Sequence, residues 1–184
     1  MAQAGCCVWF TGLSGAGKST IAEIVVGELR ARGRYVELLD GDEVREHLSK
    51  GLGFSKEDRD TNIERIGWVA SRLARAGAVV VVSAISPYDE ARRKARALVE
   101  AHAPYVLVHV ATSLAECERR DPKGLYARAH AGEIREFTGV SDPYEEPLDA
   151  ELRIETEGRT PAESTRLVLS KLVELDLAPD EVLA

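Results

Sequence analysis

The fold of this 184-residue chain is decided by one stretch, Gly12-Leu13-Ser14-Gly15-Ala16-Gly17-Lys18-Ser19. It matches the pattern G-x-x-x-x-G-K-[ST], whose glycines let successive backbone N–H groups turn toward phosphate oxygens. The apolar run 6–10 before it is typical of a strand buried on both faces, and residues 21–32 after it carry apolar positions at helical spacing. Because strand, loop and helix in this order are the expected setting of the pattern, we predict that the chain binds a nucleoside triphosphate.

Each part of this phosphate loop has an expected role. The helix that follows presents its positive end to the phosphates, Lys18 can reach the β- and γ-phosphates, and the Ser19 hydroxyl can ligate Mg²⁺. We therefore predict a set of ATP-binding residues, namely Gly12, Leu13, Ser14, Gly15, Ala16, Gly17, Lys18, Ser19 and Thr20.

Strand-like and helix-like segments alternate along the rest of the chain. Strands are expected over 6–10, 35–39, 78–82, 105–111 and 152–156, and helices over 21–32, 58–76, 89–102, 114–119 and from residue 160 onward. Such alternation predicts right-handed β-α-β units, and therefore an α/β P-loop NTPase fold with a five-stranded parallel sheet and helices on both faces. Segment 121–147 breaks the pattern with its glycines, prolines and charges, and a loop of that length is either functional or disordered.

Composition and charge exclude several other classes of protein. With 24 Lys and Arg against 31 Asp and Glu, the formal net charge is −7, which argues against a partner such as nucleic acid or an anionic membrane. Cys6, Cys7 and Cys117 form no C-x-x-C pair, and their odd number argues against a disulfide framework. The longest apolar run, 76–85, is about half of a membrane span, and no signal-peptide pattern opens the chain, so we expect a cytoplasmic protein.

Two carboxylates follow the second expected strand, in Asp40-Gly41-Asp42. Open parallel sheets bind their ligands at the carboxyl ends of their strands. One of these carboxylates could hold Mg²⁺ while the other accepts a proton from an attacking hydroxyl, and the pattern does not decide which does which. With Arg45 nearby, the arrangement favours a small-molecule kinase with an anionic acceptor. No D-x-x-G pattern follows an expected strand as in switch GTPases, and their N-K-x-D pattern is missing from the sequence.

Six segments in register resemble the adenylylsulfate kinase family, which uses ATP to phosphorylate the 3′-hydroxyl of adenosine 5′-phosphosulfate in sulfate activation. The resemblance runs from about residue 5 to 175. It implies Mg²⁺ as cofactor, a homodimer, and a single kinase domain over 1–184 with a mobile lid at about 121–147, a length that leaves no room for a fused sulfurylase. The matching segments are residues 12–20, 39–45, 53–62, 85–88, 120–126 and 131–145.

The resemblance also implies the residues of the site. Phe54 and Phe137 would stack on the two faces of the acceptor's adenine, a contact typically worth about 1–3 kcal/mol per base. Asp42 would orient the acceptor hydroxyl or take its proton, and Asp40 would lie near Mg²⁺. The implied catalytic residues are Asp42, Lys18, Asp40 and Arg120, the acceptor-binding residues are Asp42, Arg45, Phe54, Arg59, Asn62, Ile85, Ser86, Lys123, Phe137 and Thr138, and the metal ligands are Ser19 and Asp40.

Two other functions are still compatible with the sequence. One is a related kinase that phosphorylates a gluconate, shikimate or nucleoside hydroxyl. The other is a regulator that binds nucleotide without turnover, to which Glu43 and His130 would point as departures from the family pattern. Ser86 is expected to form a substrate hydrogen bond or a turn and not a phosphorylated intermediate, because in-line transfer needs no covalent step.

Overall fold

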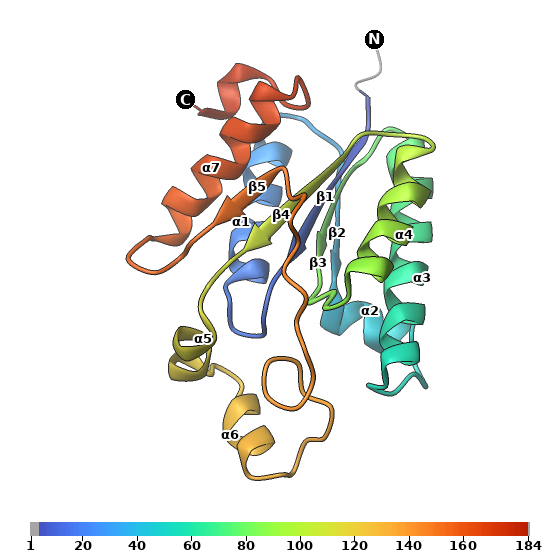
Figure 1. Ribbon diagram of the computed structural model, residues 1–184. Coiled ribbons are helices and arrows are strands. Elements are labelled where there is room, and N and C mark those ends of the chain that lie inside the picture. The colour runs from blue at the N-terminus through green and yellow to red at the C-terminus, as the bar shows by residue number, and fades with distance from the viewer. Residues whose placement is uncertain (1–3, 184) are drawn as a thin grey trace.

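The computed structural model describes residues 4–183, which fold around one parallel sheet (Figure 1). Its five strands lie in the order β2-β3-β1-β4-β5, and every neighbouring pair is parallel. This confirms the α/β architecture with a five-stranded parallel sheet. The strands are β1 Cys6–Thr11, β2 Val36–Asp40, β3 Val79–Ser83, β4 Tyr105–Val110 and β5 Leu152–Ile154.

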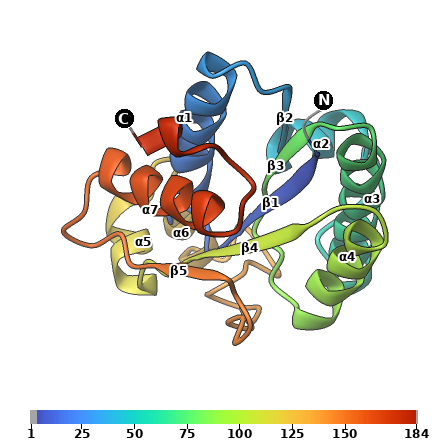
Figure 2. The ribbon, with the colours of Figure 1, turned by 90° about the horizontal axis from the view of Figure 1, so that it is seen from above.

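Helices cover both faces of the sheet, as Figure 2 shows. Helices α1 (Lys18–Ala31) and α7 (Pro161–Glu174) pack against each other on one face, and α3 (Lys56–Arg75) and α4 (Asp89–Glu100) pack against each other on the other. Each face has its own apolar core. Four shorter elements complete the chain: α2 Gly41–His47, α5 Leu114–Arg120, α6 Leu125–His130 and a 3₁₀ turn at Asp180–Leu183.

The central strands are mostly apolar because both of their faces are covered. All residues of β1, β3 and β4 are buried, including the four consecutive valines of β3. The register places Ser83 beside both Phe10 and Asp40, so the chain leaves β1, β2 and β3 at one edge of the sheet. The three segments expected to carry the chemistry are thereby brought together.

Local hydrogen bonds determine where the helices begin, and the sequence predicts some of these bonds. Helix α7 begins with the capping box between Thr160 and Glu163. Helix α3 begins earlier than predicted, because the Ser55 hydroxyl accepts from the Asp58 backbone N–H and caps it. Helix α1 also begins earlier, at Lys18, so the last residues of the phosphate loop already lie in its first turn.

Segment 121–147 is more ordered than its composition suggests, since it contains helix α6. The Asp121 carboxylate accepts from the backbone N–H groups of Tyr126 and Ala127, which satisfies two donors of that short helix. All three cysteines are buried and unbridged. Across residues 4–183, the helices are too short or too polar to span a membrane.

Candidate active site

A cavity of about 1130 Å³ opens at the carboxyl edge of the sheet. The phosphate loop, helix α2, the start of α3, the β3–α4 connection and parts of segment 120–138 line it. Every predicted site residue lines this cavity except Gly12 and Leu13. The fold therefore brings together predicted site residues that are up to 124 positions apart, such as Ser14 and Thr138.

The phosphate loop has the backbone that its glycines predict. Gly15 and Gly17 have positive φ values of 72° and 103°. Gly12 lies outside the cavity, where a Cβ would approach the Val110 carbonyl oxygen to 2.5 Å, so its role here is close packing against β4. The Lys18 ammonium is buried and donates to the Leu13 carbonyl at 2.8 Å. Burial lowers the pKa of Lys18 to about 8.

Three oxygen-bearing side chains meet beside the loop. The Ser19 hydroxyl donates to Asp40 Oδ2 at 2.8 Å and lies 3.0 Å from the Ser83 hydroxyl. The other oxygen of Asp40 accepts from the Asp42 backbone N–H at 3.0 Å and caps α2. Asp40 is thus held toward Ser19, whereas the exposed Asp42 carboxylate pairs with Lys123. The two aspartates therefore face different partners, a distinction that the sequence left open.

The Phe54 ring, which is half exposed, stands at the wall of the cavity near two guanidinium groups. The guanidinium carbons of Arg45 and Arg59 lie 4.5 Å and 5.6 Å from its centroid, within the range of cation–π attraction. Arg45 also donates to the Gly53 carbonyl at 2.9 Å, and the Asp58 carboxylate accepts from the Gly53 N–H at 2.9 Å. Both backbone polar groups of Gly53, the residue before Phe54, are therefore hydrogen-bonded, which holds the loop that presents the ring.

Arg59 connects this loop to the segment that crosses the cavity. Its side chain is buried, and it donates to the carbonyls of Phe54 (2.7 Å) and Glu136 and to the Thr138 hydroxyl (2.9 Å). One turn further along α3, Asn62 is 5% exposed, and its Oδ1 has no hydrogen-bond partner among residues 4–183. A buried acceptor without a partner is uncommon, and here it lines the cavity.

Phe137 is placed differently from Phe54. It is 9% exposed, and its ring packs edge-on against Tyr126, with centroids 5.1 Å apart. The Tyr126 hydroxyl in turn donates to the Ser14 carbonyl at 2.9 Å. Phe137 is therefore held by core packing that extends to the phosphate loop, while Phe54 is held by charged neighbours.

Arg120, a predicted catalytic residue, lies next to a part of the cavity, the β5–α7 connection, that the sequence reasoning missed. It donates to Glu116 at 2.7 Å and to the Thr156 hydroxyl at 3.2 Å. Lining residues in the β5–α7 connection include Arg159 and Pro161. Their position after a strand's carboxyl end was the available signal, because ligands of such sheets bind at that edge.

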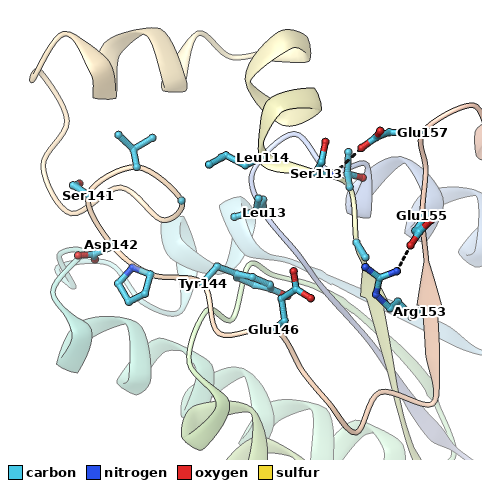
Figure 3. Close-up of a pocket in the computed structure, with 15 residues that line it drawn as sticks. Leu13, Ser113, Leu114, Ser141, Asp142, Tyr144, Glu146, Arg153, Glu155 and Glu157 are labelled. Atoms are coloured by element: carbon cyan, nitrogen blue, oxygen red, sulfur yellow. Dashed lines mark hydrogen bonds and ion pairs between the residues drawn. The ribbon is translucent and has the colours of Figure 1, made fainter.

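A second cavity, of about 750 Å³, lies beside Leu13. Leu13 is the one predicted site residue that lines it. Figure 3 shows the acidic side chains around it, with Arg153 paired to Glu155. This cavity holds neither the phosphate-loop lysine nor the two aspartates, so the chemistry is expected in the larger one.

Comparisons with known proteins agree with this geometry. A family model described as adenylylsulphate kinase matches residues 4–155. An adenylyl-sulfate kinase of Microcystis aeruginosa is 54% identical, covering 95% of each chain. A probable bifunctional SAT/APS kinase of Sorangium cellulosum is 53% identical over 96% of this chain, which spans only 30% of that protein's length. The Mycobacterium tuberculosis APS kinase CysC, solved in complex with AMPPNP and APS, is 45% identical, with a TM-score of 0.90 and coverage of 93% of this chain and 99% of that one.

Proposed function

The chain belongs to the adenylylsulfate kinase family, and from that premise we propose that it transfers the γ-phosphoryl group of ATP to the 3′-hydroxyl of adenosine 5′-phosphosulfate. The observation that carries the proposal is that one cavity is lined both by the phosphate loop and by the Phe54–Arg59–Asn62 group. A kinase needs its two substrates in one cavity so that the acceptor oxygen can approach the phosphorus in line with the leaving ADP oxygen.

On the donor side, the phosphate loop would hold ATP. The backbone N–H groups of residues 14–19 and the positive end of α1 suit the β- and γ-phosphates. The buried Lys18 ammonium would exchange its contact with the Leu13 carbonyl for phosphate oxygens and stabilise the charge that shifts toward ADP as the bond breaks. Arg120 and Arg159 line the same cavity, and we expect them to lie near the phosphates and the adenine of ATP.

Ser19 and Asp40 fit a magnesium ion that arrives with ATP. Mg²⁺ prefers hard oxygen ligands, and the Ser19 hydroxyl and the Asp40 carboxylate lie 2.8 Å apart beside the phosphate loop. When bound, the ion would neutralise charge on the β- and γ-phosphates. Among residues 4–183, no group of three or more His, Cys, Asp and Glu side chains is arranged to hold a metal, so phosphate oxygens and water would complete the ligand set.

On the acceptor side, Phe54 and Phe137 would stack on adenine, while Arg45 and Arg59 hold the phosphosulfate. The Phe54 ring is half exposed, so part of its surface is open to a base. The unpartnered Asn62 Oδ1 would accept from a ribose hydroxyl. Ile85 and Ser86 border the same space, and Thr138 would close it from the lid.

Asp42 would accept the proton of the attacking 3′-hydroxyl as the oxygen–phosphorus bond forms and the bond to ADP breaks. Its carboxylate is exposed to the cavity and pairs with Lys123. An anionic substrate gives Lys123 a second partner, so the lysine would move to the transferred phosphoryl group and leave Asp42 to the hydroxyl. Segment 121–147, which carries Lys123, would act as a lid that excludes water.

A coupled assay of ADP release tests the proposal. Turnover should require adenosine 5′-phosphosulfate and Mg²⁺, and Asp42→Ala should lose it, whereas Glu43→Gln, at the neighbouring exposed position of α2, should keep it. Gluconate, shikimate and nucleosides in place of the acceptor test the related-kinase alternative. Tight nucleotide binding without ADP release would favour the regulator and reject the proposal.

The homodimer, which rests on the family resemblance, and the cytoplasmic location, which rests on the sequence pattern, also belong to this proposal. Light scattering coupled to size-exclusion chromatography would measure the mass in solution, and a monomer at assay concentrations would reject the dimer.

A further inference from the structure

Ser86 has a backbone conformation that residues with a Cβ rarely adopt, with φ at +49°. Such a conformation persists where the surrounding structure over-determines it, and it occurs preferentially at functional sites. Ile85 and Ser86 line the larger cavity. The contacts that hold this dipeptide therefore decide the shape of the cavity wall.

Strand β1 holds the dipeptide from one side. The Thr11 hydroxyl donates to the Ile85 carbonyl at 2.6 Å, and Trp9 Nε1 donates to the Ser86 hydroxyl at 3.0 Å. Both donors are buried in the centre of the sheet. These two bonds fix the Ile85 carbonyl and the Ser86 side chain. The Thr11 hydroxyl reaches the Ser86 carbonyl only at 3.5 Å, so the short bond to that carbonyl comes from another partner.

That partner is Arg92, on the first turns of α4. Its side chain is 2% exposed, and it donates from Nη1 to the Ser86 carbonyl and from Nη2 to the Glu145 carbonyl, both at 2.7 Å. The nearest carboxylate, that of Asp89, is further away at 3.4 Å. Burying a charge is unfavourable unless it is hydrogen-bonded, and the planar guanidinium is suited to binding two acceptors at once.

Glu145 belongs to the stretch that leaves segment 121–147, and it is bonded to the same turn. Its N–H donates to the Pro87 carbonyl at 2.9 Å, and its carboxylate accepts from the Asp89 N–H at 2.7 Å. The Tyr144 hydroxyl lies 3.0 Å from that of Thr11, and Figure 3 shows Tyr144 on the same stretch. Arg92 thus bonds both the cavity wall and the base of the proposed lid.

We propose that Arg92 is a positioning residue for the acceptor, acting through the Ile85–Ser86 wall and the Tyr144–Glu145 stretch without touching either substrate. This rests on the proposed function, in which Ile85 and Ser86 border the acceptor. Loss of the guanidinium leaves the Ser86 carbonyl with only the 3.5 Å contact to the Thr11 hydroxyl and lets the wall relax to a commoner conformation. Donor binding is left intact, because Lys18 and the phosphate loop are held by other bonds.

Kinetics of Arg92→Met and Arg92→Lys test this, with Arg96→Met as the matched control. Arg96 lies one turn further along α4 and is also partly buried, but its guanidinium binds Glu151, at 2.8 and 3.0 Å. Arg92→Met is expected to raise KM for adenosine 5′-phosphosulfate by about ten- to a hundredfold, the usual effect of misplaced substrate groups, with KM for ATP unchanged. The KM of Arg92→Lys for adenosine 5′-phosphosulfate should lie between those of the unsubstituted chain and Arg92→Met, since an ammonium keeps the charge but cannot bind two acceptors in the planar geometry of a guanidinium.

Equal changes in the two KM values, or the same pattern in Arg96→Met, would mean that Arg92 acts through stability alone and would overturn the proposal. A measurement without turnover uses Trp9, which the Ser86 hydroxyl contacts directly. In a Trp68→Phe background, Trp9 is the one remaining tryptophan. Its emission should shift in both Arg92 variants and not in Arg96→Met, and an unshifted spectrum would also overturn the proposal. No acceptor-dependent ADP release by the unsubstituted chain would instead reject the proposed function, while the Trp9 spectra still decide whether Arg92 holds the wall.

Discussion

Arg59→Met removes the bonds that join the two sides of the cavity while keeping an unbranched apolar stem in place of the side chain. Arg59 is 7% exposed and donates to two carbonyls and one hydroxyl, in Phe54, Glu136 and Thr138. A hydrogen bond from a charged donor contributes about 1.5–3 kcal/mol. The freed acceptors border the cavity and can turn to water, and a buried charge is removed as well. We therefore expect a loss of about 2–4 kcal/mol in the free energy of unfolding, below the sum of three such bonds.

Urea unfolding followed by circular dichroism measures this loss. Arg65→Met is the matched control, because Arg65 lies on the same helix, is exposed, and makes one long bond of 3.2 Å to the Leu48 carbonyl. Its loss should stay below about 0.5 kcal/mol, as for ordinary surface substitutions. Limited proteolysis should also cut residues 131–142 faster in Arg59→Met. A loss below about 1 kcal/mol with unchanged proteolysis would refute the role given to Arg59.

Four further results are expected. Burial lowers the pKa of Lys18 to about 8, so the free protein loses this proton as the pH rises above 8. ATP affinity by calorimetry should then be level below pH 8 and fall above it by up to about tenfold per pH unit, and Lys18→Met should show no such dependence. Burial lowers the pKa of His109 to about 4 from 6.5, so its contribution to stability is present above pH 6.5 and is lost as the pH falls toward 4. Denaturant titrations should show up to about 3 kcal/mol lost over that range, and His109→Gln should abolish that part. Gly139→Ala should lower Tm more than Gly132→Ala. Both glycines have positive φ, but only at Gly139 would a Cβ approach other side chains, those of Leu13 and Leu114, at 3.1 and 3.2 Å. Equal decreases in Tm would reject that contact. Phe54→Ala should raise KM for the acceptor alone, in line with a stacking contribution of about 1–3 kcal/mol, and an equal rise for ATP would argue against acceptor stacking.

Much of the fold was predictable because the central strands are almost entirely apolar, as in β3, where four valines precede Ser83. Helix α6 was not, since its six residues are too few to show a periodicity. Its stability comes from the Asp121 carboxylate and from Tyr126 packing against Phe137, contacts that exist only once the segment folds back.

The candidate site was predictable where its chemistry is local to a motif. Lys18 and Ser19 belong to one loop, and Asp40 follows from the rule that ligands bind at strand ends. The role of Arg92 was not predictable in this way, because in the sequence it is only one of several charged residues of a helix. Its burial depends on Glu145, 53 residues further along the chain, which the fold returns to the start of α4.

The position of phosphorylation tests the central claim most directly. The purified chain would be incubated with ATP, Mg²⁺ and adenosine 5′-phosphosulfate, and the product examined by mass spectrometry and ³¹P NMR. We predict one added phosphoryl group on the 3′-oxygen, and no product from the 3′-deoxy acceptor. Phosphorylation at another position, turnover of the 3′-deoxy acceptor, or release of ADP without a phosphorylated nucleotide would contradict the account.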